Sequence, residues 1–513
     1  MEDRSVGLVQ EMQKTVYVGT FVQSKSLQEL DFCAKGAVGV DENGRIAFTS
    51  RGFDNLETVL KEHEGWSGAK VIEGQKNGFF FPGFIDTHIH APQYPNAGIF
   101  GKSTLLDWLN TYTFPTESSF SSLSKARLIY NRVVRRTLSH GTTTAAYYAT
   151  IHVDSTNLLA SICLSNGQRA FIGRVCMDAD LSPPTYRDAS AADSVTSTLA
   201  VINYIRQLDP HGALIAPIIT PRFAPSCTAH ALSLLGALQH EHNLLAQTHI
   251  SENPSEVALV ASLFPSASSY ADVYDAAGLL NPRTILAHAV HLTPEETALV
   301  HARGVKVAHC PASNSALTSG VAPVRALLDH GIDVGLGTDV SGGYSPSVLE
   351  AARQAVLVSR LRSVIVAADR EREQRGRKGS GGGAETEGSD DAEHAKLSTE
   401  EALYLATRGG AQVVGLADRI GAFEVGMEWD AQMIGLGALV GGKDHDQDST
   451  EEVEAEGADS ETVEDVETSP VDIFGWESWA ERVDKWVFNG DDRNTLAVWV
   501  KGRLVHKREG VEV

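Results

Sequence analysis

The chain has 513 residues, 42% of them hydrophobic, and a formal net charge of -23 at pH 7. This acidic balance argues against nucleic acid as a partner, because phosphate binding needs Lys and Arg concentrated on one face. No stretch approaches the roughly 18 uninterrupted apolar residues of a membrane-spanning helix, so no membrane partner is predicted. Five scattered cysteines without CxxC spacing, and an N-terminus unlike a secretory signal, predict a location in the cytoplasm.

Short apolar runs near both ends of the chain predict the strands of a small β-sandwich. In chain order these runs are 16–22, 36–50, 430–437 and 496–505. The second run contains a tight DENGR turn that joins two strands. We therefore assign residues 1–75 and 430–513 to one sandwich built from both termini, with a closing helix in the second segment.

Between these segments, short apolar runs alternate with longer helix-like stretches. Eight candidate strands end at His88, Tyr147, Met177, Thr220, His249, His288, His309 and Asp339, and the first of them covers residues 79–88. Continuous apolar strands that alternate with helices indicate a parallel sheet buried on both faces. Eight such units predict an α/β fold, the (β/α)8 TIM barrel, over residues 76–368, with C-terminal helices over 397–429. An open doubly wound sheet is the alternative, but the glycine-rich dinucleotide fingerprint is absent after the first strand.

Two segments, 369–396 and 441–469, are rich in Gly, Ser, Asp and Glu and contain almost no large apolar side chains. Burial cannot offset the entropy of ordering such segments, so both are predicted to be solvated, mobile insertions. A regulatory or docking role is the alternative. About half of the net charge comes from the twelve acidic residues within 444–467, a range without Lys or Arg.

Polar residues at the C-terminal ends of the predicted strands are expected to face the mouth of the barrel. Among them, histidines and an aspartate suggest a metal site. His88 and His90 are two residues apart, so both imidazoles point to the same face of a strand. An HxH pair alone is more often a surface or core feature than a ligand pair. His249, His288 and Asp339 end three further strands, however, and a barrel brings the C-terminal ends of all its strands to one rim. Five metal-competent groups are therefore expected around one cavity.

A bound divalent ion lowers the pKa of its water from about 16 toward about 7 and so supplies a nucleophile near neutral pH. Hydrolysis also needs a group that moves the proton. Glu252, three residues after His249, is expected to take it from the water and deliver it to a departing nitrogen. The alternative for Glu252 is an ordinary exposed loop residue.

Several segments resemble the amidohydrolase superfamily. They are PGFIDTHIHAPQY (82–94), THISEN (248–253), AHAVHL (287–292), AHCPASN (308–314) and GLGTDVSGGYS (335–345). A second group of segments is similar to the guanine deaminase family within it. These are TYTFPTE (111–117), RVVRRTLSHGTTTAAYYATIH (132–152), GQRAFIGRVCMD (167–178), TPRFAPSC (220–227) and FNGDDRN (488–494). The resemblance extends from about residue 75 to the C-terminus, interrupted by the two insertions.

The resemblance implies the metal ligands and the catalytic residues. The ligands of one zinc per subunit would be His88, His90, His249 and Asp339. His288 would hydrogen-bond the attacking water, Glu252 would move the proton, and Asp339 would accept a proton while it binds the ion. Imidazole suits iron as well as zinc, so iron is not excluded. The strand ALIAPIIT (213–220) contains no lysine of the kind that bridges two metals in binuclear relatives, which favours one ion.

The resemblance also implies a set of substrate contacts. Gln93 and Arg222 would hold a purine by hydrogen bonds, Arg222 through the carbonyl oxygen, while Phe223 packs on the ring. The remaining contacts would come from His90, His249, Glu252 and Asp339. For Arg222 the alternative is an ion pair at the barrel rim, and for Phe223 it is core packing. Trp108 belongs either to a segment that covers the site or to an ordinary helix face.

The implied reaction is the hydrolytic deamination of guanine to xanthine and ammonia, and the implied assembly is a homodimer. One alternative is another aminohydrolase of the superfamily that acts on a different purine, a pyrimidine or a triazine. A second is a barrel that has lost catalysis and serves as a scaffold. The HxE and PCxxC motifs of the unrelated zinc deaminases are absent from the chain.

Overall fold

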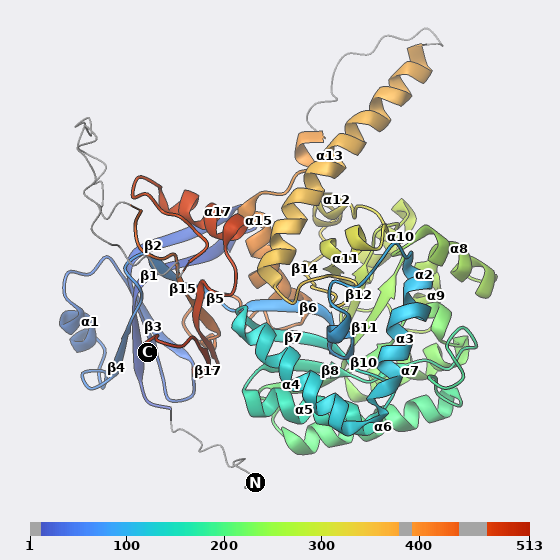
Figure 1. Cartoon of the computed structure of the whole chain (residues 1–513), viewed down its shortest axis with the longest axis horizontal. Helices are drawn as coiled ribbons and strands as arrows, with labels where there is room; N and C mark the ends of the chain where they lie inside the picture. The colour runs from blue at the N-terminus through green and yellow to red at the C-terminus, as the bar shows by residue number, and fades with distance from the viewer. Residues whose placement is uncertain (1–11, 379–391, 441–468) are drawn as a thin grey trace.

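The computed structural model describes residues 12–378, 392–440 and 469–513. Most of the two predicted insertions, residues 379–391 and 441–468, lies outside the described residues, as do residues 1–11. The chain forms a barrel surrounded by helices and, beside it, a sheet built from both ends of the sequence (Figure 1). No helix in the described part of the chain is both long and apolar enough to cross a membrane.

The barrel has eight parallel strands, as predicted. They are β6 (Phe84–His90), β7 (Thr142–Tyr148), β8 (Arg169–Gly173), β10 (Ile215–Pro221), β11 (Leu245–Ile250), β12 (Thr284–His288), β13 (Lys306–His309) and β14 (Val334–Leu336). A short strand, β9 (Val175–Cys176), extends the pairing of β8 with β10. The first and last strands are joined by hydrogen bonds from Asp339 N to His88 O (2.8 Å) and from His90 N to Val340 O (3.1 Å). The sheet is therefore closed.

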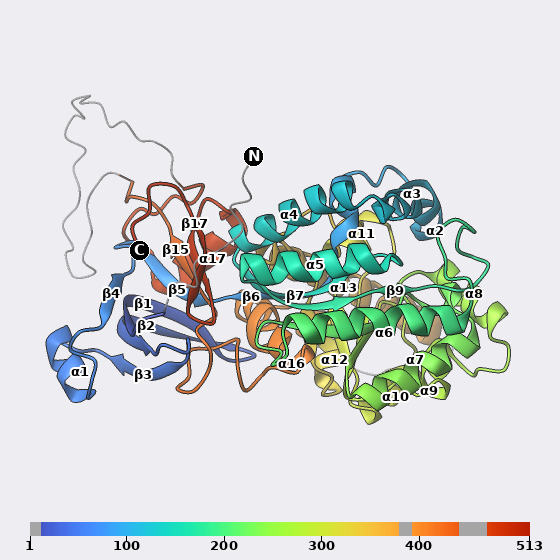
Figure 2. The same ribbon diagram turned by 90° about the horizontal axis from the view of Figure 1, so that it is seen from below.

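Helices cover the outside of the barrel (Figure 2). They include α4 (Leu123–Ser139), α5 (Val153–Asn166), α6 (Ala191–Leu208), α7 (Ala229–His242), α8 (Pro254–Leu263), α9 (Tyr270–Ala276), α10 (Pro294–Ala302), α11 (Pro311–Ala316), α12 (Val324–Asp329), α13 (Val348–Lys378), α15 (Thr399–Tyr404) and α16 (Gly410–Val413). In α4, apolar residues at spacings of three and four, such as Ile129, Tyr130, Val133 and Val134, are buried against the strands. The alternation of strands and helices confirms the predicted (β/α)8 fold.

The second sheet contains strands from both termini, as predicted. It consists of β1 (Thr15–Ser26), β2 (Glu29–Val40), β3 (Ile46–Arg51), β4 (Lys70–Glu73), β5 (Gly78–Pro82), β15 (Ala431–Gly435), β16 (Thr495–Val500) and β17 (Arg503–Lys507). The order is β17-β16-β15-β5-β1-β2-β3, with β4 paired to β1. Two helices accompany this sheet, α1 (Leu56–Glu62) and the predicted closing helix α17 (Trp479–Asn489), whose Trp486 packs on Phe79 and Phe84.

One predicted strand is two strands in the structure. Residues 79–88 were expected to form a single barrel strand, but β5 pairs with β15 of the terminal sheet and only β6 enters the barrel. Gly83 separates them, and a Cβ atom there would lie 2.2 Å from the Thr143 side chain. The close approach of β7 therefore requires glycine at this position, and the chain passes from one sheet to the other there.

The insertion predicted for residues 369–396 begins later than expected. Helix α13 continues through Lys378, ten residues into that range, and its end projects beyond the barrel (Figure 1). The segment 369–378 contains good helix formers and charges of both signs. Arg372 Nη1 is 3.3 Å from Asp369 Oδ1, one turn earlier in the helix. Low hydrophobicity therefore did not distinguish an exposed helix from a loop.

A buried arginine joins the barrel to the terminal sheet. The side chain of Arg169, at the start of β8, donates to Glu428 Oε2 at 2.6 Å and to both carboxylate oxygens of Asp430 at 3.1 and 3.3 Å. Asp430 directly precedes β15, and its Oδ1 also accepts from Lys501 N at 2.7 Å. All three charged side chains of this group are at most 3% exposed.

Replacing Arg169 by Met should strongly destabilise the protein, because two buried carboxylates would lose their cation. The loss should be about 3 to 5 kcal/mol in the free energy of unfolding. Urea denaturation followed by circular dichroism measures it. The control is Arg51→Ala, which removes a largely exposed pair with Asp31 and should cost less than about 1 kcal/mol. Similar losses in the two variants would contradict this role of Arg169.

Candidate active site

The predicted metal-competent side chains meet at the C-terminal end of the barrel. One ligand atom each from His88, His249, His288 and Asp339 lies within 4.8 Å of the others. His90 lies against the same group, because its Nε2 atom is 3.2 Å from His249 Nε2 and 3.4 Å from Asp339 Oδ1. Each of the five side chains is largely or fully buried. The structure thus brings together all five residues that the strand-end pattern singled out.

Local irregularities of the backbone aim these side chains. The pairing of β6 with β7 shifts between Asp86 and Ile89. Because of this shift, His88 and His90 face the same side of the strand as Ile85, which lies in the barrel core. His288 and Asp339 adopt left-handed backbone conformations, with φ of 73° and 46°. Such conformations are unfavourable for residues other than glycine by about 1 kcal/mol or more. Because both His288 and Asp339 adopt this unfavourable conformation, the surrounding structure must dictate the direction of their side chains.

The spacing of the donor atoms fits one tetrahedral ion. Ligands about 2.0 to 2.1 Å from zinc at tetrahedral angles are about 3.3 Å apart. His88 Nε2 to Asp339 Oδ1 is 3.1 Å, close to that value, as are the two distances from His90 Nε2. His288 Nε2 to Asp339 Oδ2 is longer, at 3.8 Å. These short distances are consistent with His90 as a ligand, while the group whose ligand atoms all lie within 4.8 Å of one another contains His288 in its place.

Hydrogen bonds on the outer side of two rings set their protonation. His249 Nδ1 lies 2.6 Å from the carbonyl oxygen of Arg222, which can only accept, so Nδ1 holds the hydrogen and Nε2 offers its lone pair to the cluster. His288 Nδ1 is 2.9 Å from Asn314 Oδ1. Asn314 was not predicted as a site residue, although it belongs to the motif AHCPASN that marked the resemblance.

The ionisation states of the cluster are those that bind metals. Burial lowers the pKa of His88, His90 and His249, which keeps these rings neutral. Burial would raise the pKa of Asp339, but the neighbouring His88 and His288 outweigh it and hold the pKa below its usual value. Metal ligands must be neutral imidazoles and ionised carboxylates, so the donor set fits a divalent cation.

Glu252 lies beside the cluster, as the proton shuttle requires. Its Oε2 is 3.4 Å from His288 Nε2, and its Oε1 accepts a hydrogen bond from Ser319 Oγ at 3.1 Å. The side chain is buried, which excludes the alternative of an exposed loop residue. Burial raises the pKa of Glu252 to about 7. A carboxyl group with such a pKa both accepts and donates protons near neutral pH.

The predicted substrate-binding residues line a cavity next to the cluster. Its wall contains His90, Gln93, Leu105, Trp108, Leu109, Arg222, Phe223, His249, Glu252, Leu317 and Asp339. Trp108 ends helix α2 (Leu105–Trp108), so that short helix covers one side of the cavity. The Phe223 ring centroid is 6.5 Å from that of His249. Polar groups, aromatic rings and the metal cluster therefore share one small space.

Arg222 forms the ion pair that had been considered as its alternative role. Its Nη1 donates to Glu117 Oε2 at 2.6 Å, and both side chains are buried. Arg222 nevertheless also lines the cavity, so the pair and the substrate contact are compatible. Glu117 was not predicted as a site residue, although it ends the segment TYTFPTE that marked the resemblance.

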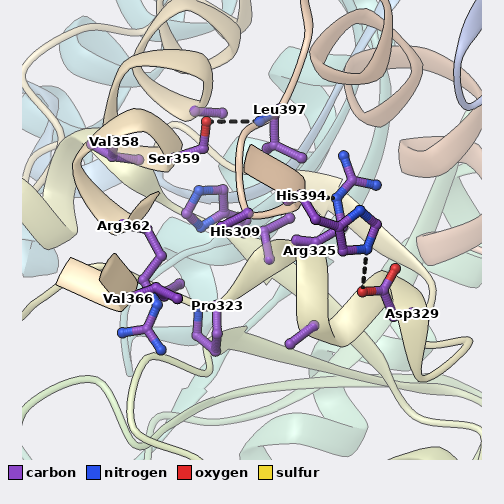
Figure 3. Close-up of a pocket in the computed structure, with 15 residues that line it drawn as sticks. His309, Pro323, Arg325, Asp329, Val358, Ser359, Arg362, Val366, His394 and Leu397 are labelled. Atoms are coloured by element: carbon purple, nitrogen blue, oxygen red, sulfur yellow. Dashed lines mark hydrogen bonds and ion pairs between the residues drawn. The ribbon is translucent and has the colours of Figure 1, made fainter. Parts of the chain in front are cut away.

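His309 ends a barrel strand like His288 but points away from the cluster. It lines a separate pocket between β13, α12 and α13, together with Arg362, Asp329 and His394 (Figure 3). The ring is buried, and neither nitrogen has a hydrogen-bond partner among the described residues. Side chains of a strand alternate between its faces, and Val307, two residues earlier, also packs outside the barrel. The expectation that polar strand ends face the mouth is therefore wrong for His309.

The sequence of this chain matches a known protein family. Residues 79–505 match the amidohydrolase family, a range that contains the whole cluster and Glu252. The chain belongs to the amidohydrolase family.

Individual relatives are similar over nearly the whole chain. A probable guanine deaminase of Schizosaccharomyces pombe is 46% identical over 96% of this chain and 83% of its own length. Guanine deaminase of Homo sapiens is 37% identical over 96% of both chains. The crystal structure of guanine deaminase from C. acetobutylicum with bound guanine has a TM-score of 0.78 and 29% identity, and the match covers 96% of this chain and 100% of that one. The similarity thus includes the barrel and the terminal sheet.

The cluster predicts a measurable metal content. The purified protein should contain about one equivalent of a divalent transition metal, and Asp339→Ala should contain much less, because the only ionised ligand is lost. Inductively coupled plasma mass spectrometry measures both. His309→Ala is the matched control, since it removes a buried strand-end histidine that faces away, and it should keep its metal. Full metal content in Asp339→Ala would contradict the assignment.

Proposed function

We propose that this protein catalyses the hydrolytic deamination of guanine to xanthine and ammonia. The main observation is that one buried cavity contains a metal-competent cluster, a carboxyl group that titrates near pH 7 and side chains suited to a purine. The similarity to guanine deaminases over almost the entire chain supports guanine as the substrate.

In this proposal, one zinc ion is bound by His88, His90, His249 and Asp339. When bound, such an ion is a Lewis acid that lowers the pKa of a water molecule from about 16 toward about 7. The spacing of the four donor groups supports this set. Iron in the same site is the alternative.

Glu252 is the proposed proton carrier. It takes a proton from the attacking water and delivers it to the exocyclic nitrogen of guanine, which leaves as ammonia. The Ser319 hydroxyl holds Oε1, so Oε2 remains for the transfer. Burial would lower the pKa of His288, but the carboxylates of Glu252 and Asp339 outweigh it and raise the pKa. His288 is therefore suited to donate a hydrogen bond at the point where the water lies.

Gln93, Arg222 and Phe223 are the proposed purine-binding residues. A guanidinium group donates hydrogen bonds to a carbonyl oxygen, and an aromatic ring packs against the face of a purine. Apolar side chains of Leu105, Leu109 and other cavity residues exclude water around them. This environment strengthens each polar contact with the base.

Ammonia release from candidate bases tests the proposed function. Metal-loaded protein should release ammonia from guanine, with xanthine as the other product. Activity on another purine, a pyrimidine or a triazine but not on guanine would support the alternative aminohydrolase. Absence of activity on all of them in a folded, metal-loaded protein would contradict an enzymatic role and favour a scaffold.

The change Glu252→Gln should abolish turnover without loss of metal. The amide cannot accept the proton, and removing a general base typically costs about 10²- to 10⁴-fold in kcat. Stopped-time assays of xanthine formation measure kcat, and metal analysis of the same sample provides the control. A kcat within about threefold of the unchanged protein would exclude Glu252 as the proton carrier.

The proposal includes a cytoplasmic location and a homodimer. All five cysteines lie in the described part of the chain and are free, as expected in a reducing compartment. Leu357, Leu361 and Val364 form an exposed apolar stripe on α13, with spacings of four and three residues. Such a stripe supports self-association.

A further inference from the structure

We propose that Glu117 is a positioning residue that fixes Arg222 and Gln93 in the orientations needed to hold guanine. The inference rests on the proposed function and extends it to a residue outside the set that the resemblance implied. Glu117 lies on the short helix α3 (Phe114–Ser118) and its side chain is fully buried. It reaches the two substrate-binding residues from behind the cavity wall.

The first contact is a two-point ion pair. Arg222 Nη1 donates to Glu117 Oε2 at 2.6 Å and Nη2 donates to Oε1 at 3.2 Å. Such a paired arrangement fixes the plane of the guanidinium group as well as its position. Arg222 Cζ also lies 5.3 Å from the ring centroid of Phe114, on the same helix. Helix α3 therefore restrains Arg222 through a carboxylate and an aromatic ring.

The second contact fixes the amide of Gln93. Gln93 Nε2 donates to Glu117 Oε1 at 2.8 Å, while Gln93 Oε1 accepts from Ser341 N at 3.3 Å. An ionised carboxylate only accepts hydrogen bonds and a backbone N–H only donates, so only one of the two amide orientations satisfies both neighbours. Glu117 thus fixes the orientation of the Gln93 amide, with Nε2 toward Glu117 and Oε1 toward Ser341 N.

A third donor completes the group. Tyr186 Oη donates to Glu117 Oε2 at 2.8 Å. Burial raises the pKa of Tyr186 well above its usual value, so its hydroxyl keeps its proton. The carboxylate oxygens of Glu117 accordingly receive hydrogen bonds from Arg222, Gln93 and Tyr186. These three side chains all donate to the Glu117 carboxylate. A neutral amide in place of this carboxylate could not accept hydrogen bonds from all three.

Charge balance is a further reason for a carboxylate here. The Arg222 cation lines the same cavity as His90, His249 and Asp339 of the cluster. A buried cation without a partner is strongly unfavourable, and beside a cation-binding cluster it would be more so. Glu117 compensates this charge, so Arg222 can remain next to the cluster and offer its other N–H groups to a base.

These contacts have a consequence for specificity. With Arg222 held by Glu117, the cavity presents a donor that, in the proposed binding mode, meets the carbonyl oxygen of guanine. A purine with an amino group at that position would place N–H against N–H, which leaves both groups unsatisfied. Glu117 therefore acts on base selection through Arg222 without touching the base.

The change Glu117→Gln tests this role by steady-state kinetics on guanine with metal-loaded protein. The KM should rise by about tenfold or more while kcat changes much less, because contacts made equally in the ground and transition states are lost. Glu117→Asp keeps the charge on a shorter side chain and should give an intermediate KM. Glu401→Gln is the matched control, since it removes another buried carboxylate, paired with Arg325, and neither residue of this pair lines the cavity. It should lower the melting temperature without changing KM.

A double-mutant cycle with Arg222→Ala separates positioning from general loss of structure. If Glu117 acts through Arg222 and Gln93, Glu117→Gln should raise KM by a clearly smaller factor in the Arg222→Ala background than in the unchanged chain, because only the contact with Gln93 is then left to lose. The inference would be overturned if Glu117→Gln raised KM by the same factor with and without Arg222→Ala. It would also be overturned if Glu117→Gln alone left KM unchanged. If the protein without substitutions does not act on guanine, the proposed function fails instead. Failure of the inference and failure of the proposed function are therefore distinguishable.

Discussion

The barrel buries four imidazole rings and an aspartate carboxylate within a few ångströms of one another, and hydrogen bonds among these groups do not satisfy them. His90 Nε2 faces His249 Nε2 at 3.2 Å, and the hydrogen of His249 lies on its other nitrogen. Burial opposes charge on the rings, so protonation does not resolve the contact. A divalent cation would accept lone pairs from His88, His90, His249 and the Asp339 carboxylate at once. The left-handed backbone conformations at His288 and Asp339 direct these two side chains toward the same point.

Two further kinds of chemistry, proton exchange and substrate binding, are arranged around this centre and are kept apart. Glu252 lies on one side with a pKa raised by burial, where it can exchange a proton. Arg222 and Gln93 lie on another side and are held by Glu117 from behind the wall. Each carboxylate therefore has a different environment and a different task. The fold makes this possible because the loops after many separate strands reach the same mouth.

Much of the fold was predictable because its pattern is local. Each of the eight predicted barrel strands occurs, and the strands of both termini form a second sheet. The exceptions are positions where a local pattern supports two structures. The run ending at His88 has large apolar residues on both sides of Gly83, so its hydrophobicity does not mark the transfer between sheets. Likewise, the charged residues 369–378 suit a solvent-exposed helix as well as a loop.

The strand-end pattern predicted site residues only where the residue type itself indicates a metal ligand, and Gln93, Arg222 and Phe223 were expected from the resemblance. His288 and His309 both end strands, and the register pairs Ala287 with Ala308, so alternation would turn both histidines outward. His288 enters the site because its φ is positive, which the sequence does not show. Glu117 is 105 residues from Arg222 and resembles any other glutamate in its local sequence. Its position behind the cavity depends on tertiary packing.

Anomalous diffraction from crystals of the zinc-loaded protein, recorded on both sides of the zinc absorption edge, tests the central claim directly. The account predicts one peak per chain, within about 2.0 to 2.2 Å of His88, His90, His249 and Asp339, with His288 outside bonding distance. A peak bonded to His288 in place of His90, two neighbouring peaks, or a peak away from this cluster would contradict it.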